Sequence, residues 1–331
     1  MNKILERLIN HHKLTRQEAR EVLTGIGQGK YNQSHVTAFL TVFLMRLVTV
    51  DELLGFRDAL LDLCIQTDLS EFNTIDLCGT GGDGKNTFNI STLASFLVAG
   101  AGEKVSKHGN YGVSSASGSS DMLEHFGYKF SNNRDKLARE LDEAGICFLH
   151  APLFHPAMKF VGPIRKELQL KTFFNILGPL VNPSFPEYQV AGVFNLEVAR
   201  LYQYIFQQTD KKYKIVYSLD GYDEISLTSQ VKIISNMGEE LLSPAELGFH
   251  KLKQEDLFGG YNVKEAASIF INILEGKGTS EQKDVVIANA ALGLQSLNQQ
   301  ELYSNAVARA RESLDSGNAV QAFHKLININ T

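Results

Sequence analysis

Cysteine is scarce in this chain of 331 residues, which contains only Cys64, Cys78 and Cys147. No two of them form a Cys-x-x-Cys pair and their number is odd, which argues against both a disulfide framework and a zinc site built from cysteines. We interpret all three as small, buried, apolar side chains.

Long hydrophobic runs are also absent. Apolar residues make up 44% and charged residues 21% of the chain, and no window approaches the ~20 consecutive apolar residues of a membrane span. Charged side chains interrupt the first six residues, Met1 to Glu6, which is not the pattern of a signal peptide. We therefore expect a cytoplasmic protein with no membrane partner.

A cluster of basic residues is the third missing feature. The formal net charge is −5 and no run of Lys and Arg occurs, which disfavours nucleic acid as a partner. A polyanionic small molecule would therefore need local cations or a metal ion. Fixed-period repeats and low-complexity tracts are missing too, which excludes solenoids and long disordered tails.

The chain begins with the pattern of a small helical domain, which we place at residues 1–70. Two capping boxes, Thr15-Arg-Gln-Glu18 and Thr49-Val-Asp-Glu52, predict helix starts. The segment Val36–Val48 is apolar on nearly all sides, so we expect it to pack against the next domain or a second subunit. Apolar residues recur at helical spacing in Ile4–Ile9, Ala19–Ile26, Val36–Leu47 and Leu53–Cys64.

Residues 71–331 instead alternate short β runs with helical stretches. This alternation predicts an α/β domain with a central, mostly parallel sheet flanked by helices, and functional loops at the carboxyl ends of its strands. Several prolines interrupt residues 154–185, part of which we expect to return to the helical domain. The predicted strands are Thr74–Cys78, Lys104–Lys107, Ile146–Leu149, Gln189–Val193, Lys214–Ser218 and Val231–Ser235.

A glycine-rich turn, Gly79-Thr-Gly-Gly-Asp-Gly84, follows the first predicted strand. It satisfies the dinucleotide-binding expression, but Lys85–Asn89 separates it from the next helix, and Asp83 lies inside the turn. It also fails as a P-loop, because Asn86 follows the lysine where Ser or Thr would bind Mg²⁺. The alternative is a plain strand-closing turn. We favour a phosphate site, with Asn89 or Ser91 capping the next helix.

A second loop, Lys107-His-Gly-Asn110 followed by the serine-rich residues 114–120, comes after the next strand. One lysine, several hydroxyls and backbone amides suit a phosphate that is bound without a basic patch. The alternative is a solvated linker, which the Lys-His-Gly-Asn start and the predicted helix beyond disfavour. His108 remains open to either a structural or a catalytic role.

Two further sites carry charge. Asp223 and Glu224 are adjacent carboxylates after a strand, and they are either exposed surface charges or hard oxygen ligands for Mg²⁺. Arg165 is either a surface helix residue or a bidentate partner for a carboxylate.

Together these segments resemble the anthranilate phosphoribosyltransferases, and the resemblance covers essentially the full chain. The motifs that carry it are Gly79-Thr-Gly-Gly-Asp83, Thr87-Phe-Asn-Ile-Ser-Thr92, Lys107-His-Gly-Asn110, Ser114-Ser115, Gly118-Ser119, His155-Pro-Ala-Met-Lys159, Phe174-Asn-x-Leu-Gly-Pro-Leu-x-Asn-Pro183 and Asp223-Glu224.

The resemblance implies a small helical domain on a large α/β domain, of the nucleoside phosphorylase type and not the Rossmann type, and a homodimer formed through the helical part. It implies transfer of the 5-phosphoribosyl group from phosphoribosyl pyrophosphate to the amine of anthranilate, with release of pyrophosphate, in tryptophan biosynthesis. The implied cofactor is Mg²⁺.

The resemblance also implies the roles of individual residues. Lys107, with the metal, would stabilise charge, and no general base is implied. The phosphoribosyl pyrophosphate contacts would be Gly79, Gly82, Asp83, Thr87, Asn89, Ser91, Thr92, Lys107, Ser115 and Ser119. The anthranilate contacts would be Gly79, His108, Asn110 and Arg165. The Mg²⁺ ligands would be Ser91, Asp223 and Glu224.

Three residues depart from the family pattern. Tyr111 stands where an arginine is usual, which removes one expected cation, Ser120 replaces an alanine and Lys171 replaces an arginine. Two other functions stay open. A nucleoside phosphorylase of the same fold would need base-reading residues at Asn110 and Arg165, and a non-catalytic nucleic-acid binder would need a basic groove.

Overall fold

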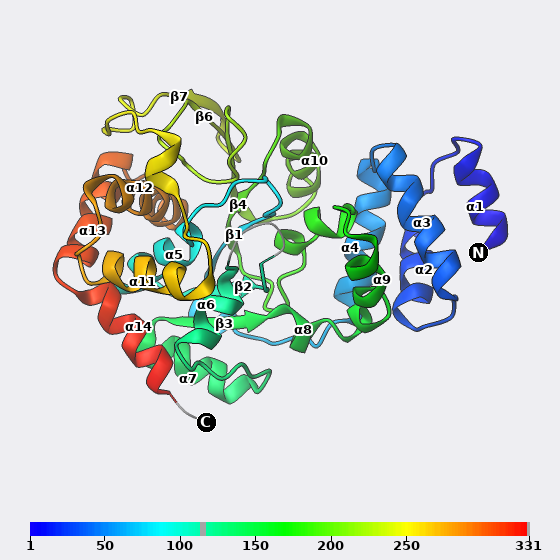
Figure 1. Ribbon diagram of the computed structural model, residues 1–331, viewed down its shortest axis with the longest axis horizontal. Coiled ribbons are helices and arrows are strands. Elements are labelled where there is room, and N and C mark those ends of the chain that lie inside the picture. The colour runs from blue at the N-terminus through cyan, green and yellow to red at the C-terminus, as the bar shows by residue number, and fades with distance from the viewer. Residues whose placement is uncertain (113–116, 330–331) are drawn as a thin grey trace.

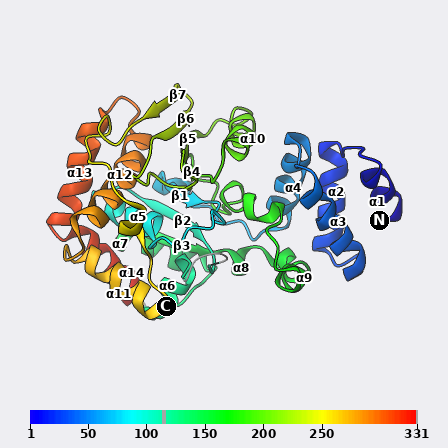
Figure 2. The ribbon, with the colours of Figure 1, turned by 45° about the horizontal axis from the view of Figure 1, so that its top comes forward.

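The computed structural model describes residues 1–112 and 117–329. Figures 1 and 2 show a group of four helices at one end of the molecule and the helices of the last third at the other. The first group consists of α1 (Asn2–Ile9), α2 (Arg16–Gly27), α3 (Gln33–Met45) and α4 (Val50–Leu63).

Both capping boxes predicted in this helical part are confirmed. Thr15 accepts from the N–H of Glu18 at the start of α2, and Thr49 accepts from that of Glu52 at the start of α4. Glu52 is fully buried, where it pairs with Arg46 at 2.6 Å and accepts from the N–H of Leu14 at 2.9 Å. One carboxylate therefore joins the starts of two helices.

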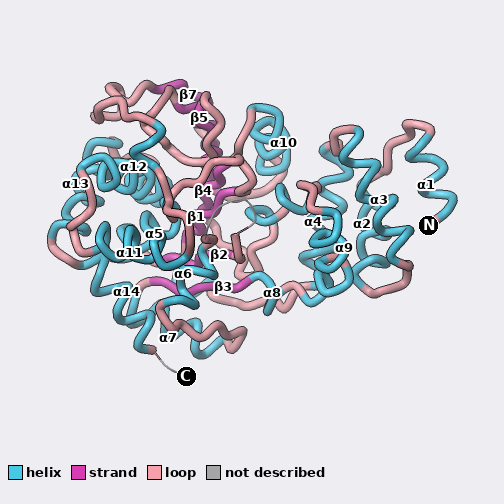
Figure 3. Tube along the Cα trace, in the orientation of Figure 1, coloured by secondary structure: helices cyan, strands magenta, loops and turns pink. Residues whose placement is uncertain are grey.

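A seven-stranded sheet lies in the middle of the molecule (Figure 3) in the order β3-β2-β1-β4-β5-β6-β7. The pairs from β3 to β5 are parallel, and β6 and β7 are antiparallel additions at one edge. The strands are β1 (Ile75–Gly79), β2 (Val105–Gly109), β3 (Ile146–His150), β4 (Tyr188–Gly192), β5 (Lys212–Ser218), β6 (Val231–Ser235) and β7 (Gly238–Leu242). The prediction of a mostly parallel sheet is confirmed.

Helices cover both faces of this sheet. On one side α5 contacts β1 and α12, and on the other α10 contacts β5 and α4. The remaining helices are α5 (Ile90–Gly100), α6 (Ser119–His125), α7 (Arg134–Ala144), α8 (Ala151–Phe154), α9 (Gly162–Leu168), α10 (Leu196–Phe206), α11 (Val263–Leu274), α12 (Ser280–Leu297), α13 (Tyr303–Asp315) and α14 (Asn318–Asn328), with 3₁₀ turns η1 (Ser70–Phe72), η2 (Pro156–Phe160), η3 (Phe173–Ile176), η4 (Gly178–Leu180) and η5 (Gln254–Leu257).

The proline-rich segment crosses to the helical end, where Phe173 enters an aromatic cluster. Its ring stacks on Phe56 with centroids 4.4 Å apart and meets Phe39 and Phe43 edge-on at 6.2 and 5.3 Å. Buried aromatic contacts of this kind stabilise a junction beyond the area they bury. The division into domains at residues 70 and 71, with part of 154–185 joining the helical side, remains our proposal. No helix among the described residues is long and apolar enough to cross a bilayer.

Candidate active site

A cavity of about 250 Å³ opens at the carboxyl ends of β1 and β2, where the proline-rich segment faces them. Every predicted site residue that the structure describes lines this cavity, whereas Ser115 lies outside the described residues. Those lining residues are Gly79, Gly82, Asp83, Thr87, Asn89, Ser91, Thr92, Lys107, His108, Asn110, Ser119, Arg165, Asp223 and Glu224.

The glycine turn after β1 forms one wall. Gly81, Gly82 and Gly84 have φ values of 60°, 74° and 77°, a region that residues with a Cβ rarely adopt. The N–H of Gly81 donates to Oδ2 of Asp223 at 2.7 Å, and the N–H of Lys85 donates to Oδ1 of Asp83 at 3.0 Å. The turn already holds carboxylate oxygens, so its amides are positioned to bind anions.

The start of α5 forms the next wall. Asn89 occupies the N-cap position, but its side-chain oxygen makes no capping bond, and its amide nitrogen donates to the carbonyl of Ser117 at 3.0 Å. The N–H of Ser91 is instead satisfied by Oε1 of Glu224 at 3.0 Å. Asn89 is therefore at the N-cap as predicted, but neither its side chain nor that of Ser91 makes the capping bond, which comes from a carboxylate distant in sequence.

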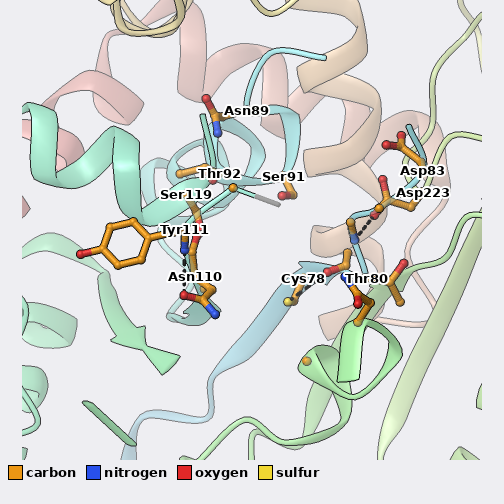
Figure 4. Close-up of a pocket in the computed structure, with 18 of the residues that line it drawn as sticks. Cys78, Thr80, Asp83, Asn89, Ser91, Thr92, Asn110, Tyr111, Ser119 and Asp223 are labelled. Carbon is orange, nitrogen blue, oxygen red and sulfur yellow. Dashed lines mark hydrogen bonds between the residues drawn. The ribbon is translucent and has the colours of Figure 1, made fainter. Parts of the chain in front are cut away.

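Three acidic side chains gather on this side of the cavity, and Figure 4 shows Asp83 beside Asp223. Burial, and then the charge of Asp83, raise the pKa of Asp223 to about 7. Burial, and then the charge of Asp223, raise the pKa of Glu224 well above its usual value. Burial likewise raises the pKa of Asp83.

This cluster has the donor chemistry of a magnesium site. Mg²⁺ prefers hard oxygen ligands, and a divalent cation would offset both the burial and the neighbouring negative charge that raise the pKa values of Asp223 and Glu224. Among residues 1–112 and 117–329, no three or more His, Cys, Asp or Glu side chains converge on a common metal position. Two carboxylates with waters and substrate oxygens are a usual set for Mg²⁺, so the residues present fit the ion.

Lys107 brings a positive charge beneath the cavity. It comes from β2, is 2% exposed, and donates through Nζ to the carbonyl of Leu77 at 2.5 Å and to Oγ of Ser91 at 3.4 Å. An ammonium has three donors, so these two contacts hold the charge in place and leave one donor for an anion.

The second loop is closed by one carboxylate. Asp121, in α6, accepts through Oδ2 from the N–H of Gly112 at 2.7 Å and from that of Gly118 at 2.8 Å. The carbonyl of Asn110 accepts from the N–H of Ser120 at 3.1 Å, and its side-chain oxygen from the N–H of Tyr111 at 2.8 Å. The amide nitrogen of Asn110 is thereby left as the donor of this side chain.

Two of the three departures from the family pattern meet at His150, the last residue of β3. The Tyr111 ring packs edge-on against the imidazole with centroids 5.0 Å apart, and Oγ of Ser120 lies 2.8 Å from its Nδ1. The Phe130 ring stacks on the same imidazole with centroids 4.1 Å apart. Figure 4 shows the Tyr111 ring pointing away from the glycine turn, so it supports the loop and does not replace the missing cation.

The opposite wall belongs to the proline-rich segment. His108 is buried, and its Nδ1 lies 3.1 Å from the carbonyl of Gly178, an acceptor, which places the ring proton on Nδ1. Burial lowers the pKa of His108 to about 3, so the ring is neutral. Arg165 lies over the Phe174 ring at 5.3 Å and contacts Oδ1 of Asn175 at 3.4 Å. Neither residue forms an ion pair among those found in the described chain.

Two models of one protein family together match most of the chain. The model of a glycosyl transferase family, a/b domain, matches residues 71–320, and that of the helical bundle domain of the same family matches residues 2–64. The anthranilate phosphoribosyltransferase of Flavobacterium johnsoniae is 58% identical over 329 residues, covering 98% of both chains. The chain belongs to the anthranilate phosphoribosyltransferase family.

Other members of the anthranilate phosphoribosyltransferase family agree. The relative from Flavobacterium psychrophilum is 57% identical over 326 residues, covering 98% of both chains. The crystal structure of the Thermus thermophilus enzyme matches with a TM-score of 0.90 and 30% identity over 98% of both chains. The Saccharomyces cerevisiae enzyme in complex with PRPP and Mg matches with a TM-score of 0.90 and 27% identity, covering 98% of this chain and 96% of that one. The predicted fold class and family are confirmed.

Some supporting residues of this family member were not predicted. Asp76, fully buried in β1, accepts from the amide of Asn182 at 2.9 Å and from the N–H of His108 at 3.2 Å. The side chain of Asn289 in α12 binds both backbone groups of Ile225: it accepts from the N–H at 3.0 Å and donates to the carbonyl at 2.9 Å. The sequence contains a signal for each of them: Asp76 is an acidic residue in an otherwise apolar strand, and Asn289 is an asparagine in an otherwise apolar part of a helix.

Proposed function

We propose that this chain transfers the 5-phosphoribosyl group of phosphoribosyl pyrophosphate to the amine of anthranilate and releases pyrophosphate, as a step of tryptophan biosynthesis. One observation supports this most directly: a single cavity joins a glycine turn, a cluster of buried carboxylates and the guanidinium of Arg165. These three features match the three parts of the reaction, which are a polyphosphate, its metal ion and a substrate carboxylate.

The two substrates would occupy opposite sides of the cavity. Anthranilate would lie against Arg165, Asn110 and Gly79, with its carboxylate on the guanidinium and His108 beside its path to the site. The phosphoribosyl pyrophosphate contacts that we propose are Gly79, Gly82, Asp83, Thr87, Asn89, Ser91, Thr92, Lys107, Ser115 and Ser119.

Mg²⁺ is the proposed cofactor, and Ser91, Asp223 and Glu224 would hold it. When bound, it supplies positive charge to the leaving pyrophosphate. Asn289 would keep Glu224 in place through its two hydrogen bonds to the adjacent Ile225 backbone.

Catalysis would rest on position and charge. The neutral aromatic amine attacks the anomeric carbon, the bond from that carbon to the pyrophosphate oxygen breaks, and its electron pair leaves with pyrophosphate. Lys107 and the amides of the glycine turn stabilise the departing charge. Arg165 and Asn110 orient the amine, which is worth more than a general base here. The amine proton passes to water or to a phosphate oxygen, and movement of the helical part toward the sheet would exclude bulk water.

We propose further that two copies associate through the helical part and that the protein acts in the cytoplasm. Met45 is 85% exposed at the end of α3, Leu47 is 60% exposed beside it, and Ile9 is 66% exposed at the end of α1. Exposed apolar side chains on one small unit are typical of an association surface. Light scattering of Met45→Glu and Leu47→Glu variants tests this, and an unchanged dimer mass would place the interface elsewhere.

The activity is tested by following the loss of anthranilate fluorescence with phosphoribosyl pyrophosphate and Mg²⁺. We expect turnover that stops on chelation of the metal, and no phosphorolysis of uridine or thymidine. The double variant Asp223→Ala, Glu224→Ala should lose Mg²⁺-dependent turnover. Its matched control, Glu239→Ala with Glu240→Ala, removes adjacent carboxylates from the exposed strand β7 and should remain active. Unchanged turnover in the first variant would refute the metal assignment, and phosphorolysis without transfer would refute the function.

A further inference from the structure

Lys171 reaches the glycine turn from a different part of the chain. It lies between α9 and η3, and its Nζ donates to the carbonyl of Gly82. A Cβ added at Gly82 would lie 3.7 Å from Cδ of Lys171, and one added at Gly84 would lie 4.0 Å from its Nζ. The side chain of Lys171 therefore lies beside the turn from Gly82 to Gly84.

The hydrogen bond from Lys171 to the carbonyl of Gly82 determines the direction in which the next N–H, that of Asp83, points. In a planar trans peptide the C=O and the following N–H point to opposite sides. Because Lys171 holds the carbonyl of Gly82, the N–H of Asp83 points away from the lysine. Gly82 and Asp83 line the cavity, and Lys171 is not among the described residues that do. The ammonium therefore contacts the turn from outside the cavity.

The charge of Lys171 and the fixed backbone that follows it both support this contact with the turn. The ammonium of Lys171 places a positive charge at the backbone of Gly82, directly before Asp83. The residue after Lys171 is also fixed, since the N–H of Thr172 donates to Oδ1 of Asn175 at 3.0 Å. Phe173 then packs into the aromatic cluster of the helical part. The lysine backbone thus has a rigid base from which to hold a glycine turn that is flexible by composition.

We propose that Lys171 is a positioning residue for pyrophosphate: it holds the Gly82 carbonyl outward and so fixes residues 82–84 in the conformation whose amides bind the anion. The identity of the anion rests on the proposed function, whereas the positioning of the turn does not. The contact also links the turn to the segment that carries Arg165, since Asn175 meets both Arg165 at 3.4 Å and the backbone after Lys171.

Calorimetric binding of inorganic pyrophosphate in the presence of Mg²⁺ tests this without any turnover. We expect Lys171→Met to weaken pyrophosphate binding by about tenfold, the scale of one charge-assisted hydrogen bond. Lys171→Arg keeps the charge and the donor and should bind within about threefold of the unchanged protein. Lys166→Met removes an exposed lysine from neighbouring α9 and serves as the control for a general change in charge.

Steady-state kinetics separates positioning from general damage. Lys171→Met should raise the KM for phosphoribosyl pyrophosphate and leave the KM for anthranilate and the melting temperature unchanged. Pyrophosphate binding equal to that of the unchanged protein, or an equal loss in Lys166→Met, would overturn the proposal. If Lys171→Met does not fold, Lys171→Gln takes its place in the same assay. Weakened pyrophosphate binding in a protein that does not act on anthranilate would support the role of Lys171 and refute the proposed function.

Discussion

The backbone N–H of Gly81 donates to Oδ2 of Asp223 at 2.7 Å across 142 residues of sequence. This bond ties the glycine turn to the carboxylate cluster, so a change in one displaces the other. Gly79 lies where the two meet, because a Cβ added there would come within 2.4 Å of the same oxygen. Its φ is not in the left-handed region, so the steric effect can be tested without backbone strain.

Gly79→Ala should therefore move the Asp223 carboxylate and reduce Mg²⁺-dependent turnover by about 100-fold, the usual cost of misplacing a catalytic group by about 1 Å. The assay is anthranilate fluorescence over a series of Mg²⁺ concentrations. Gly162→Ala is the control, because a Cβ at that position meets no atom within 4 Å. Normal turnover in Gly79→Ala would mean that the position of Asp223 is not important.

The pair formed by Ser120 and His150 gives a second prediction. Ser120→Ala leaves the buried Nδ1 of His150 without its partner, which should cost about 1–2 kcal/mol of unfolding free energy in urea titration. In His150→Phe the same serine change should cost less, so a double-mutant cycle should yield a coupling of about 1 kcal/mol. Ser304→Ala, on the exposed side of α13, controls for loss of a hydroxyl. A coupling free energy of zero in this cycle would show that the side chains of Ser120 and His150 do not interact.

Much of the fold was predictable because its elements carry local patterns. The strand Val231–Ser235 was predicted to the residue, because its run of apolar residues is a local signal. β7 was not predicted, because Gly238–Leu242 is exposed along almost its whole length and pairs only with β6. A strand at the edge of a sheet without a buried face has no alternating pattern to detect.

The candidate site also has a part that local sequence predicts and a part that it does not. Its two loops were identified from glycine, hydroxyl and lysine content close together in sequence. The carboxylate of Glu224 binds the N–H of Ser91 at the start of α5, and the ring of Tyr111 packs against His150; neither contact has a signal in the sequence around these residues. Contacts between distant residues depend on the topology of the sheet, which no local pattern encodes.

Glu140 provides a prediction for the dependence of stability on pH. It is fully buried in α7, where the hydroxyl of Tyr128 contacts both carboxylate oxygens at 2.8 and 2.9 Å. Burial raises the pKa of Glu140 from 4.5 to about 7. Because the pKa of Glu140 is higher in the folded than in the unfolded chain, the folded state favours the protonated carboxyl. The stability that this group contributes is complete below pH 4.5 and is lost as the pH rises through about 7.

Glu140→Gln should therefore have a stability close to that of the unchanged protein at pH 5 and exceed it at pH 8 by roughly 2–3 kcal/mol. Urea unfolding at the two pH values measures this difference. Glu143→Gln, partly exposed in the same helix, should show no such change. If the advantage of Glu140→Gln were larger at pH 5 than at pH 8, the assigned direction would be wrong.

Phe173 is the test of how the helical part is joined to the sheet. Its ring is 5% exposed and contacts three phenylalanines of α3 and α4. Phe173→Ala should cost about 3–5 kcal/mol of unfolding free energy, from lost burial and the cavity that remains. Phe173→Leu keeps most of the volume and should cost less than about 1.5 kcal/mol.

Calorimetry should show more than a lower melting temperature. If this cluster couples the two parts, Phe173→Ala should separate one unfolding transition into two, with the helical part melting first. Tyr204→Ala, which removes a ring that is 56% exposed on α10, should leave a single transition. Because Phe173 follows Lys171 by two residues, the same variant should also weaken pyrophosphate binding. A single transition with unchanged pyrophosphate affinity would show that the aromatic cluster stabilises the helices without reaching the active site.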